Sequence, residues 1–134
     1  HLLDVFAGTG AFALEALSQG FASVTLVDVD CGPLQCNVKL FPADVSKINV
    51  IRGDALNLPK SVTTYDLLFM DAPYNQGLSV PALKNLAAKN WLKPGALCLV
   101  EVERNEPLPL PEGFRLLEER RYGLARVVFA EFIG

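Results

Sequence analysis

Residues 2–10 read LLDVFAGTG, and residues 11–20 continue as AFALEALSQG. Apolar residues around a single Asp predict a buried strand over residues 2–6. Gly8 and Gly10 follow, and glycine adopts positive φ without strain, so a tight turn is predicted there. Apolar residues then recur at helical spacing, which predicts a helix over residues 11–19 that ends at Gly20. A strand, a glycine turn and a helix form the ligand-binding corner of an open α/β sheet, where ligands lie beyond the carboxyl ends of the strands.

The rest of the chain continues this alternation of strand and helix. Continuous apolar runs predict further strands at residues 23–29, 47–52, 65–70 and 96–102. Helices are predicted over residues 33–40 and 80–90, and a turn over residues 93–95, which read KPG. Residues 114–120 and 125–132 are predicted to form a closing pair of strands. Apolar strands joined by helices are typical of a mostly parallel, doubly wound sheet with helices on both faces.

Composition places the chain among single-domain globular proteins. It has 134 residues, of which 51% are hydrophobic and 20% charged, and its net charge of −3 gives no overall signature of nucleic-acid binding. No apolar run is long enough to span a membrane and no signal peptide is recognisable, so the cytoplasm is the expected location. Cys31, Cys36 and Cys98 form no C-x-x-C pair, so we expect no metal site, and Cys98 is expected to lie in the core.

Four of the predicted strands each carry a carboxylate, within the strand or at its carboxyl end. Asp4 lies just before the glycine turn, and Asp28, Asp54 and Asp71 lie at the carboxyl ends of the next three strands. Any one of them is explained by the ordinary use of Asp in turns and helix caps. All four together favour a binding site at that edge of the sheet.

The glycine turn fits the pattern G-x-G-x-x-A, and Asp28 follows at the distance expected for a residue that binds a ribose. By itself this pattern suggests a nicotinamide dinucleotide. However, a pyrophosphate requires positive potential at the start of the helix, and the acids supply negative potential. A cationic ligand fits better. S-adenosylmethionine has a sulfonium and an amino group, ribose hydroxyls that can donate to Asp28, and an adenine amine that can donate to Asp54.

Residues 71–74 read DAPY and form a second motif. Pro73 fixes its own φ and favours an extended conformation at Ala72, so the Asp71 carboxylate and the Ala72 carbonyl can be directed at one point. Two converging acceptors suit an exocyclic amine, which has two N–H donors. Tyr74 offers a flat face on which a base can stack. The alternative is a proline turn with a half-buried tyrosine.

These motifs, together with VTLVD at residues 24–28, GDAL at 53–56 and YDLLFMDAPY at 65–74, resemble the class I S-adenosylmethionine-dependent methyltransferases. More narrowly, the chain is similar to the bacterial family that methylates guanine N2 of 16S ribosomal RNA. The resemblance implies a Rossmann-like seven-stranded sheet, mostly parallel with an antiparallel C-terminal strand, and one catalytic domain over residues 1–134. It implies catalytic roles for Asp71, Ala72, Pro73 and Tyr74. It implies S-adenosylmethionine binding by Asp4, Phe6, Ala7, Gly8, Thr9, Gly10, Asp28, Val29, Asp54, Ala55 and Asp71.

Two features differ from the family pattern. Such enzymes usually carry Pro where this chain has Ala72, although the backbone carbonyl is retained. The basic RNA-binding segment at the family's N-terminus also has no counterpart in residues 1–134, and a chain that opens on a core strand is expected to lack such a segment.

The implied partner is 16S ribosomal RNA or the small ribosomal subunit, and the implied state is a monomer. Other interpretations stay open, namely an adenine-N6 methyltransferase acting on DNA or RNA, a non-catalytic module that binds S-adenosylmethionine or a nucleotide, and a nicotinamide dehydrogenase. The arginines near the C-terminus are expected to pair with Glu118 and Glu119 on a solvated face rather than to form an RNA surface.

Overall fold

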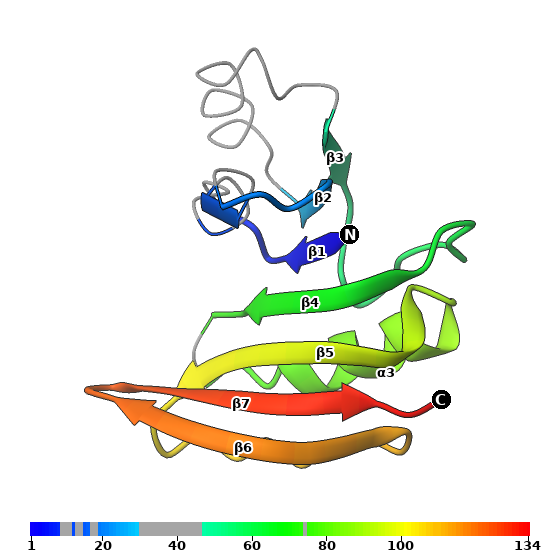
Figure 1. The fold of residues 1–134 in the computed structure, drawn as a ribbon. Helices are drawn as coiled ribbons and strands as arrows, with labels where there is room; N and C mark the ends of the chain where they lie inside the picture. The colour runs from blue at the N-terminus through cyan, green and yellow to red at the C-terminus, as the bar shows by residue number, and fades with distance from the viewer. Residues whose placement is uncertain (9–11, 13–14, 17–18, 30–46, 74) are drawn as a thin grey trace.

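The computed structural model describes residues 1–8, 12, 15–16, 19–29, 47–73 and 75–134. Seven strands form one mixed sheet in the order β3-β2-β1-β4-β5-β7-β6 (Figure 1). The strands are β1 (Leu2–Val5), β2 (Val24–Asp28), β3 (Ile48–Arg52), β4 (Tyr65–Asp71), β5 (Leu92–Glu103), β6 (Phe114–Tyr122) and β7 (Ala125–Phe132). The helix α3 spans Ser79–Ala88.

The first five strands are parallel, and β7 runs antiparallel to both β5 and β6. The predicted architecture is therefore confirmed. Because β1 lies between β2 and β4, the strand order reverses beside it, and such a reversal leaves a crevice outside the carboxyl ends of the strands. The ligand-binding corner predicted from residues 2–10 thus lies at the centre of the sheet.

Side chains on β1 alternate between two hydrophobic clusters, one on each face of the sheet. Leu3 and Val5 lie in the larger cluster with Leu83 and Leu86 of α3. Leu2 lies in the smaller cluster with Ala16. Each of these side chains is at most 9% exposed, which places the hydrophobic stabilisation on both faces of the sheet.

The smaller cluster is covered by residues of the predicted first helix. Phe12, Glu15 and Ala16 are helical, and the Phe12 ring stacks on Phe69 of β4 with centroids 3.9 Å apart. Helical residues therefore pack on the face opposite α3, as predicted. The helix predicted over residues 33–40 lies outside the described residues.

The turn predicted over residues 93–95 lies within β5 instead of before it. Tyr65 pairs with Leu92 and Leu67 pairs with Leu97, so four residues of β5 stand opposite Asp66 alone. Gly95 has a φ of 91°, which glycine adopts without strain. Pro and Gly thus interrupt the strand as expected, but pairing with β4 resumes on both sides, which makes the segment an irregular bulge.

The pairing predicted for the C-terminal arginines is confirmed for two of them, whereas Arg115 pairs with Glu131 and Arg126 is buried instead of lying on a solvated face. Arg120 lies 3.0 Å from a carboxylate oxygen of Glu118, and Arg126 lies 3.4 Å from one of Glu119. Cys98 is fully buried, in agreement with its predicted place in the core, and burial raises the pKa of its thiol to about 12.

Candidate functional site

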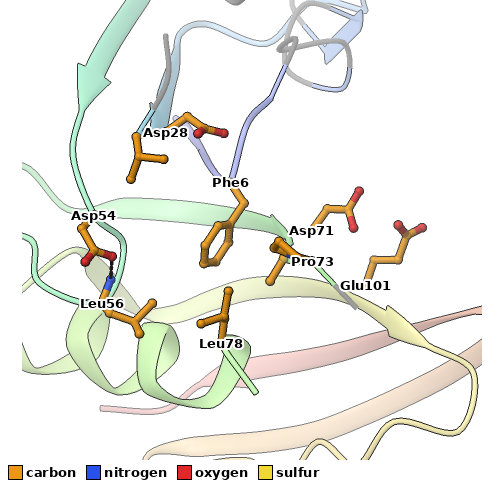
Figure 2. A pocket seen from close by; sticks show the side chains of 10 residues that line it. Phe6, Asp28, Asp54, Leu56, Asp71, Pro73, Leu78 and Glu101 are labelled. Carbon is orange, nitrogen blue, oxygen red and sulfur yellow. Dashed lines mark hydrogen bonds between the residues drawn. The ribbon is translucent and has the colours of Figure 1, made fainter. Parts of the chain in front are cut away.

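A cleft of about 720 Å³ opens at the carboxyl ends of the central strands, within the size range of small-molecule sites (Figure 2). The strand order places contributions from β2 and β3 on one side of β1 and those from β4 and β5 on the other. The described residues that line it are Phe6, Asp28, Val29, Asp54, Leu56, Asp71, Ala72, Pro73, Leu78 and Glu101.

The turn after β1 supplies an aromatic side chain to the middle of the cleft. Phe6 has a φ of 61°, a conformation that is strained for a bulky residue and that recurs at functional sites. Gly8, with a φ of 59°, takes the positive value predicted for it. The Ala7 N–H donates to the Val27 carbonyl at 3.1 Å, and the Gly8 N–H donates to Asp28 Oδ2 at 2.7 Å. These two bonds fix the turn against the end of β2.

The turn after β3 places a second carboxylate on the same side. Asp54 Oδ1 accepts the Leu56 N–H at 3.0 Å, and the Asp54 carbonyl accepts the Asn57 N–H at 2.9 Å. Asp54 therefore has the turn-forming role that a single Asp commonly has, and it also lines the cleft. Leu56 and Leu78 add apolar surface beside Phe6, as Figure 2 shows.

On the other side, β4 ends at Asp71, and Ala72 and Pro73 continue along the wall of the cleft. The segment that follows is held by Glu106, a side chain only 7% exposed. Glu106 Oε1 accepts the Asn75 N–H at 2.8 Å and the Glu103 N–H at 3.3 Å. Asn75 has a φ of 57°, a left-handed conformation that asparagine tolerates. Glu106 thus ties the chain after the DAPY motif to the end of β5.

Glu101 of β5 pairs in register with Asp71 of β4. Both carboxylates extend in the same direction from neighbouring strand ends in Figure 2, and both line the cleft. Burial, followed by the hydrogen bond and the charge of Asp71, raises the pKa of Glu101 to about 7. Because Asp71 and Glu101 would carry like charges on neighbouring strands, the pair of carboxyl groups favours the retention of one proton near neutral pH.

The cleft brings together seven of the residues that the resemblance implied: Phe6, Asp28, Val29, Asp54, Asp71, Ala72 and Pro73. Asp4, Ala7, Gly8 and Ala55 are not among its lining residues. Asp4 is only 2% exposed within β1, and Ala55 packs in the larger hydrophobic cluster, so three of the four predicted acids reach the cleft. Thr9, Gly10 and Tyr74 lie outside the described residues.

Sequence reasoning missed four residues of this region: Leu56, Leu78, Glu101 and Glu106. Glu101 could have been found, because it interrupts the apolar run of residues 96–102 near its carboxyl end, as Asp71 ends the run before it. Glu106 lies in a segment rich in proline, and no local pattern connects it to Asn75, 31 residues earlier.

Four of the described lining residues are acidic and none is basic. Such a cleft favours a cationic ligand that has many donors and disfavours a pyrophosphate. Within the described part of the chain there is no group of three or more His, Cys, Asp and Glu residues suited to a metal ion. No helix in the same part is both long and apolar enough to cross a membrane.

The sheet order, the antiparallel β7 and the position of the cleft define the Rossmann-like fold of S-adenosylmethionine-dependent methyltransferases. The crystal structure of a putative methylase from Haemophilus influenzae matches with a TM-score of 0.87 and 31% identity, covering 100% of this chain and 87% of that one. An S-adenosylmethionine-dependent methyltransferase from Mesorhizobium loti has a TM-score of 0.76 at 13% identity, covering 98% of this chain and 90% of that one, a likeness of fold alone.

The family model described as conserved hypothetical protein 95 matches residues 1–131, and the chain belongs to this family. A curated relative, ribosomal RNA small subunit methyltransferase D of Haemophilus influenzae, is 34% identical over 128 residues, which cover 91% of this chain and 66% of the relative. The chain therefore spans slightly less than two thirds of that relative's length. The resemblance stated from the motifs is confirmed at the level of the family.

Proposed function

We propose that the chain is the catalytic domain of an S-adenosylmethionine-dependent methyltransferase that acts on the exocyclic N2 amine of a guanine in 16S ribosomal RNA. The observation that carries this proposal is the arrangement of Asp71 and Ala72 in the same cleft as Asp28 and Asp54. One side of the cleft offers acceptors for a nucleoside, and the other offers acceptors for an amine.

The residues present fit S-adenosylmethionine. In this proposal Asp28 accepts from the ribose hydroxyls, and its hydrogen bond from the Gly8 N–H, which holds it beside the glycine turn, supports that role. Asp54 is proposed to accept from the adenine amine, and the apolar side chains of Phe6, Leu56 and Leu78 in the same cleft are proposed to contact the adenine ring. The excess of acids suits the positive charges of this ligand. When bound, S-adenosylmethionine supplies an electrophilic methyl group on its sulfonium.

Asp71 and the Ala72 carbonyl orient the nucleophile in this proposal. An exocyclic amine is a poor nucleophile because its lone pair is delocalised into the ring. Acceptance of its two N–H bonds by Asp71 and Ala72 favours a pyramidal nitrogen with an available lone pair. Most of the acceleration then comes from positioning and from preorganised electrostatics. Strong basicity is not required of Asp71, because the methylated ammonium is itself acidic. Tyr74 is proposed to stack on the unpaired target base.

The substrate is proposed from the relatives. The Haemophilus influenzae relative is named as a methyltransferase of small-subunit ribosomal RNA, and the motifs of this chain resemble those of guanine-N2 enzymes. We also propose that RNA affinity depends on a basic segment outside residues 1–134, that the protein acts as a monomer, and that it works in the cytoplasm, where this RNA is found.

The test is methyl transfer from labelled S-adenosylmethionine to unmodified small-subunit RNA, both free and assembled into subunits. Methylated nucleosides are identified by mass. N2-methylguanosine supports the proposal. N6-methyladenosine keeps the mechanism and changes the substrate, since adenine-N6 enzymes share the second motif. Measurable binding of S-adenosylmethionine without any product favours the non-catalytic alternative. A fluorescence titration with NADH tests the dehydrogenase alternative, and no binding is expected.

A further inference from the structure

The cleft has one more hydrogen-bond acceptor beside Asp71 than the proposed chemistry at the amine requires. Two acceptors suffice for the two N–H bonds of an exocyclic amine, and Asp71 and the Ala72 carbonyl supply them. Glu101 is a third acceptor on the same wall of the cleft, one strand further along the sheet. Once Asp71 and the Ala72 carbonyl accept both N–H bonds of the amine, Glu101 can accept from a different donor.

Glu101 and Asp71 are neighbouring acids that retain one proton between them near neutral pH. Burial and the neighbouring Asp71 act in the same direction and favour the protonated form of Glu101. On its other side, Glu101 stands opposite the uncharged Val127 of β7 in the sheet register. A carboxyl group with a raised pKa that lines a cleft beside a second acid is typical of a functional site, and its ionised form can accept from a donor.

The base-pairing edge of guanine matches this row of acceptors. It carries the two N–H bonds of the N2 amine and, directly beside them, the ring N1–H. Adenine differs at this point, because its ring N1 has a lone pair and no hydrogen. A carboxylate beside the amine site therefore attracts guanine and repels adenine, while a protonated carboxyl does the reverse.

We propose that Glu101 is the specificity-determining residue of the cleft and that its carboxylate accepts the ring N1–H of the target guanine next to the amine held by Asp71. The inference deepens the proposed function and rests on it. On binding, Glu101 releases the proton it shares with Asp71 to solvent and receives the N1–H as a hydrogen bond, so no proton leaves the base. The pair thereby distinguishes guanine from adenine.

The test compares two short RNA substrates with the full chain. One carries guanosine at the target position, and the other carries 2-aminopurine riboside, which keeps the 2-amine but has a lone pair at N1. At a pH above the Glu101 pKa of about 7, where its carboxylate is ionised, we expect unaltered protein to prefer guanosine by about 10-fold or more in kcat/KM, because an acceptor left unpaired in the cleft is costly. In Glu101→Gln the amide can donate to N1 of 2-aminopurine, so the preference is expected to shrink to a few-fold or to reverse.

Glu103→Gln is the matched control, because Glu103 lies two residues further along the chain and is not a lining residue of the cleft. It is expected to retain the full preference for guanosine. Equal losses on both substrates in Glu101→Gln, with unchanged affinity for S-adenosylmethionine, would show that Glu101 acts only through Asp71 and would overturn the inference alone. Failure of the unaltered protein to methylate guanosine RNA overturns the proposed function as well.

Discussion

Replacement of Glu106 by Ala tests whether the segment after the DAPY motif is positioned from a distance. Glu106 Oε1 accepts two backbone N–H groups, from Asn75 at 2.8 Å and from Glu103 at 3.3 Å, and the side chain is 7% exposed. Hydrogen bonds to a charged group contribute about 1.5–3 kcal/mol each. Because the second bond is long, the loss on Glu106→Ala is expected to be about 2–4 kcal/mol.

Glu106→Ala is also expected to slow catalysis. Asn75 is four residues from Asp71, and a displacement of about 1 Å at a reacting group can lower turnover about 100-fold. We therefore expect Glu106→Ala to lower kcat by about 10- to 100-fold. Affinity for S-adenosylmethionine should change little, because Asp28 and Asp54 lie on the other side of β1.

Glu106→Gln is the informative partner variant. Both bonds are accepted by the same oxygen, Oε1, which an amide keeps, so most of the stability and activity should be retained. Urea unfolding gives the change in free energy of unfolding, and single-turnover methyl transfer gives the change in rate. Equal turnover in the Ala and Gln variants would refute the reasoning, since the two differ in whether the backbone donors keep an acceptor.

The same geometry supports three further predictions. Asp71→Ala should lower single-turnover methyl transfer by about 100-fold or more with little change in cofactor affinity, and an unchanged rate would remove Asp71 from the mechanism. Asp66→Ala, at an exposed position near the amino-terminal end of the same strand, is the control and should keep its rate. Asp28→Ala should weaken S-adenosylmethionine binding by about 10- to 100-fold in calorimetry, since it loses a charged acceptor, and an undiminished affinity would contradict the assignment. Folding raises the pKa of Glu101 from its ordinary value of 4.5 to about 7, so the stabilising contribution of its protonated form is complete below pH 4.5 and is lost as the pH rises through 7. The Tm of unaltered protein relative to that of Glu101→Gln should therefore fall between pH 4.5 and 8, and parallel Tm curves would show that the pKa is not raised.

Local patterns predicted most elements of the fold because strands and helices differ in the period of their apolar residues. The apolar run of β1 and the two glycines after it indicated the corner of the sheet, and DAPY indicated the end of β4. Prediction was less successful at residues 93–95, where Pro and Gly correctly indicated a break. Whether such a break ends a strand or forms a bulge depends on the partner strand, here on the pairing of Tyr65 with Leu92.

The sequence by itself determined the fold class, the family motifs and the acids at three strand ends, because each depends on residues close together in the chain. Only the tertiary structure decided which acids share the cleft. Asp4 reads like Asp28 in the sequence, yet it is buried within β1, since side-chain direction follows the sheet register rather than residue type. Glu101 meets Asp71, 30 positions earlier, because parallel strands bring distant carboxyl ends to one edge. The hydrogen bond between Glu106 and the Asn75 N–H likewise depends on the tertiary structure, because it joins the segments after β4 and β5, which no local sequence pattern connects.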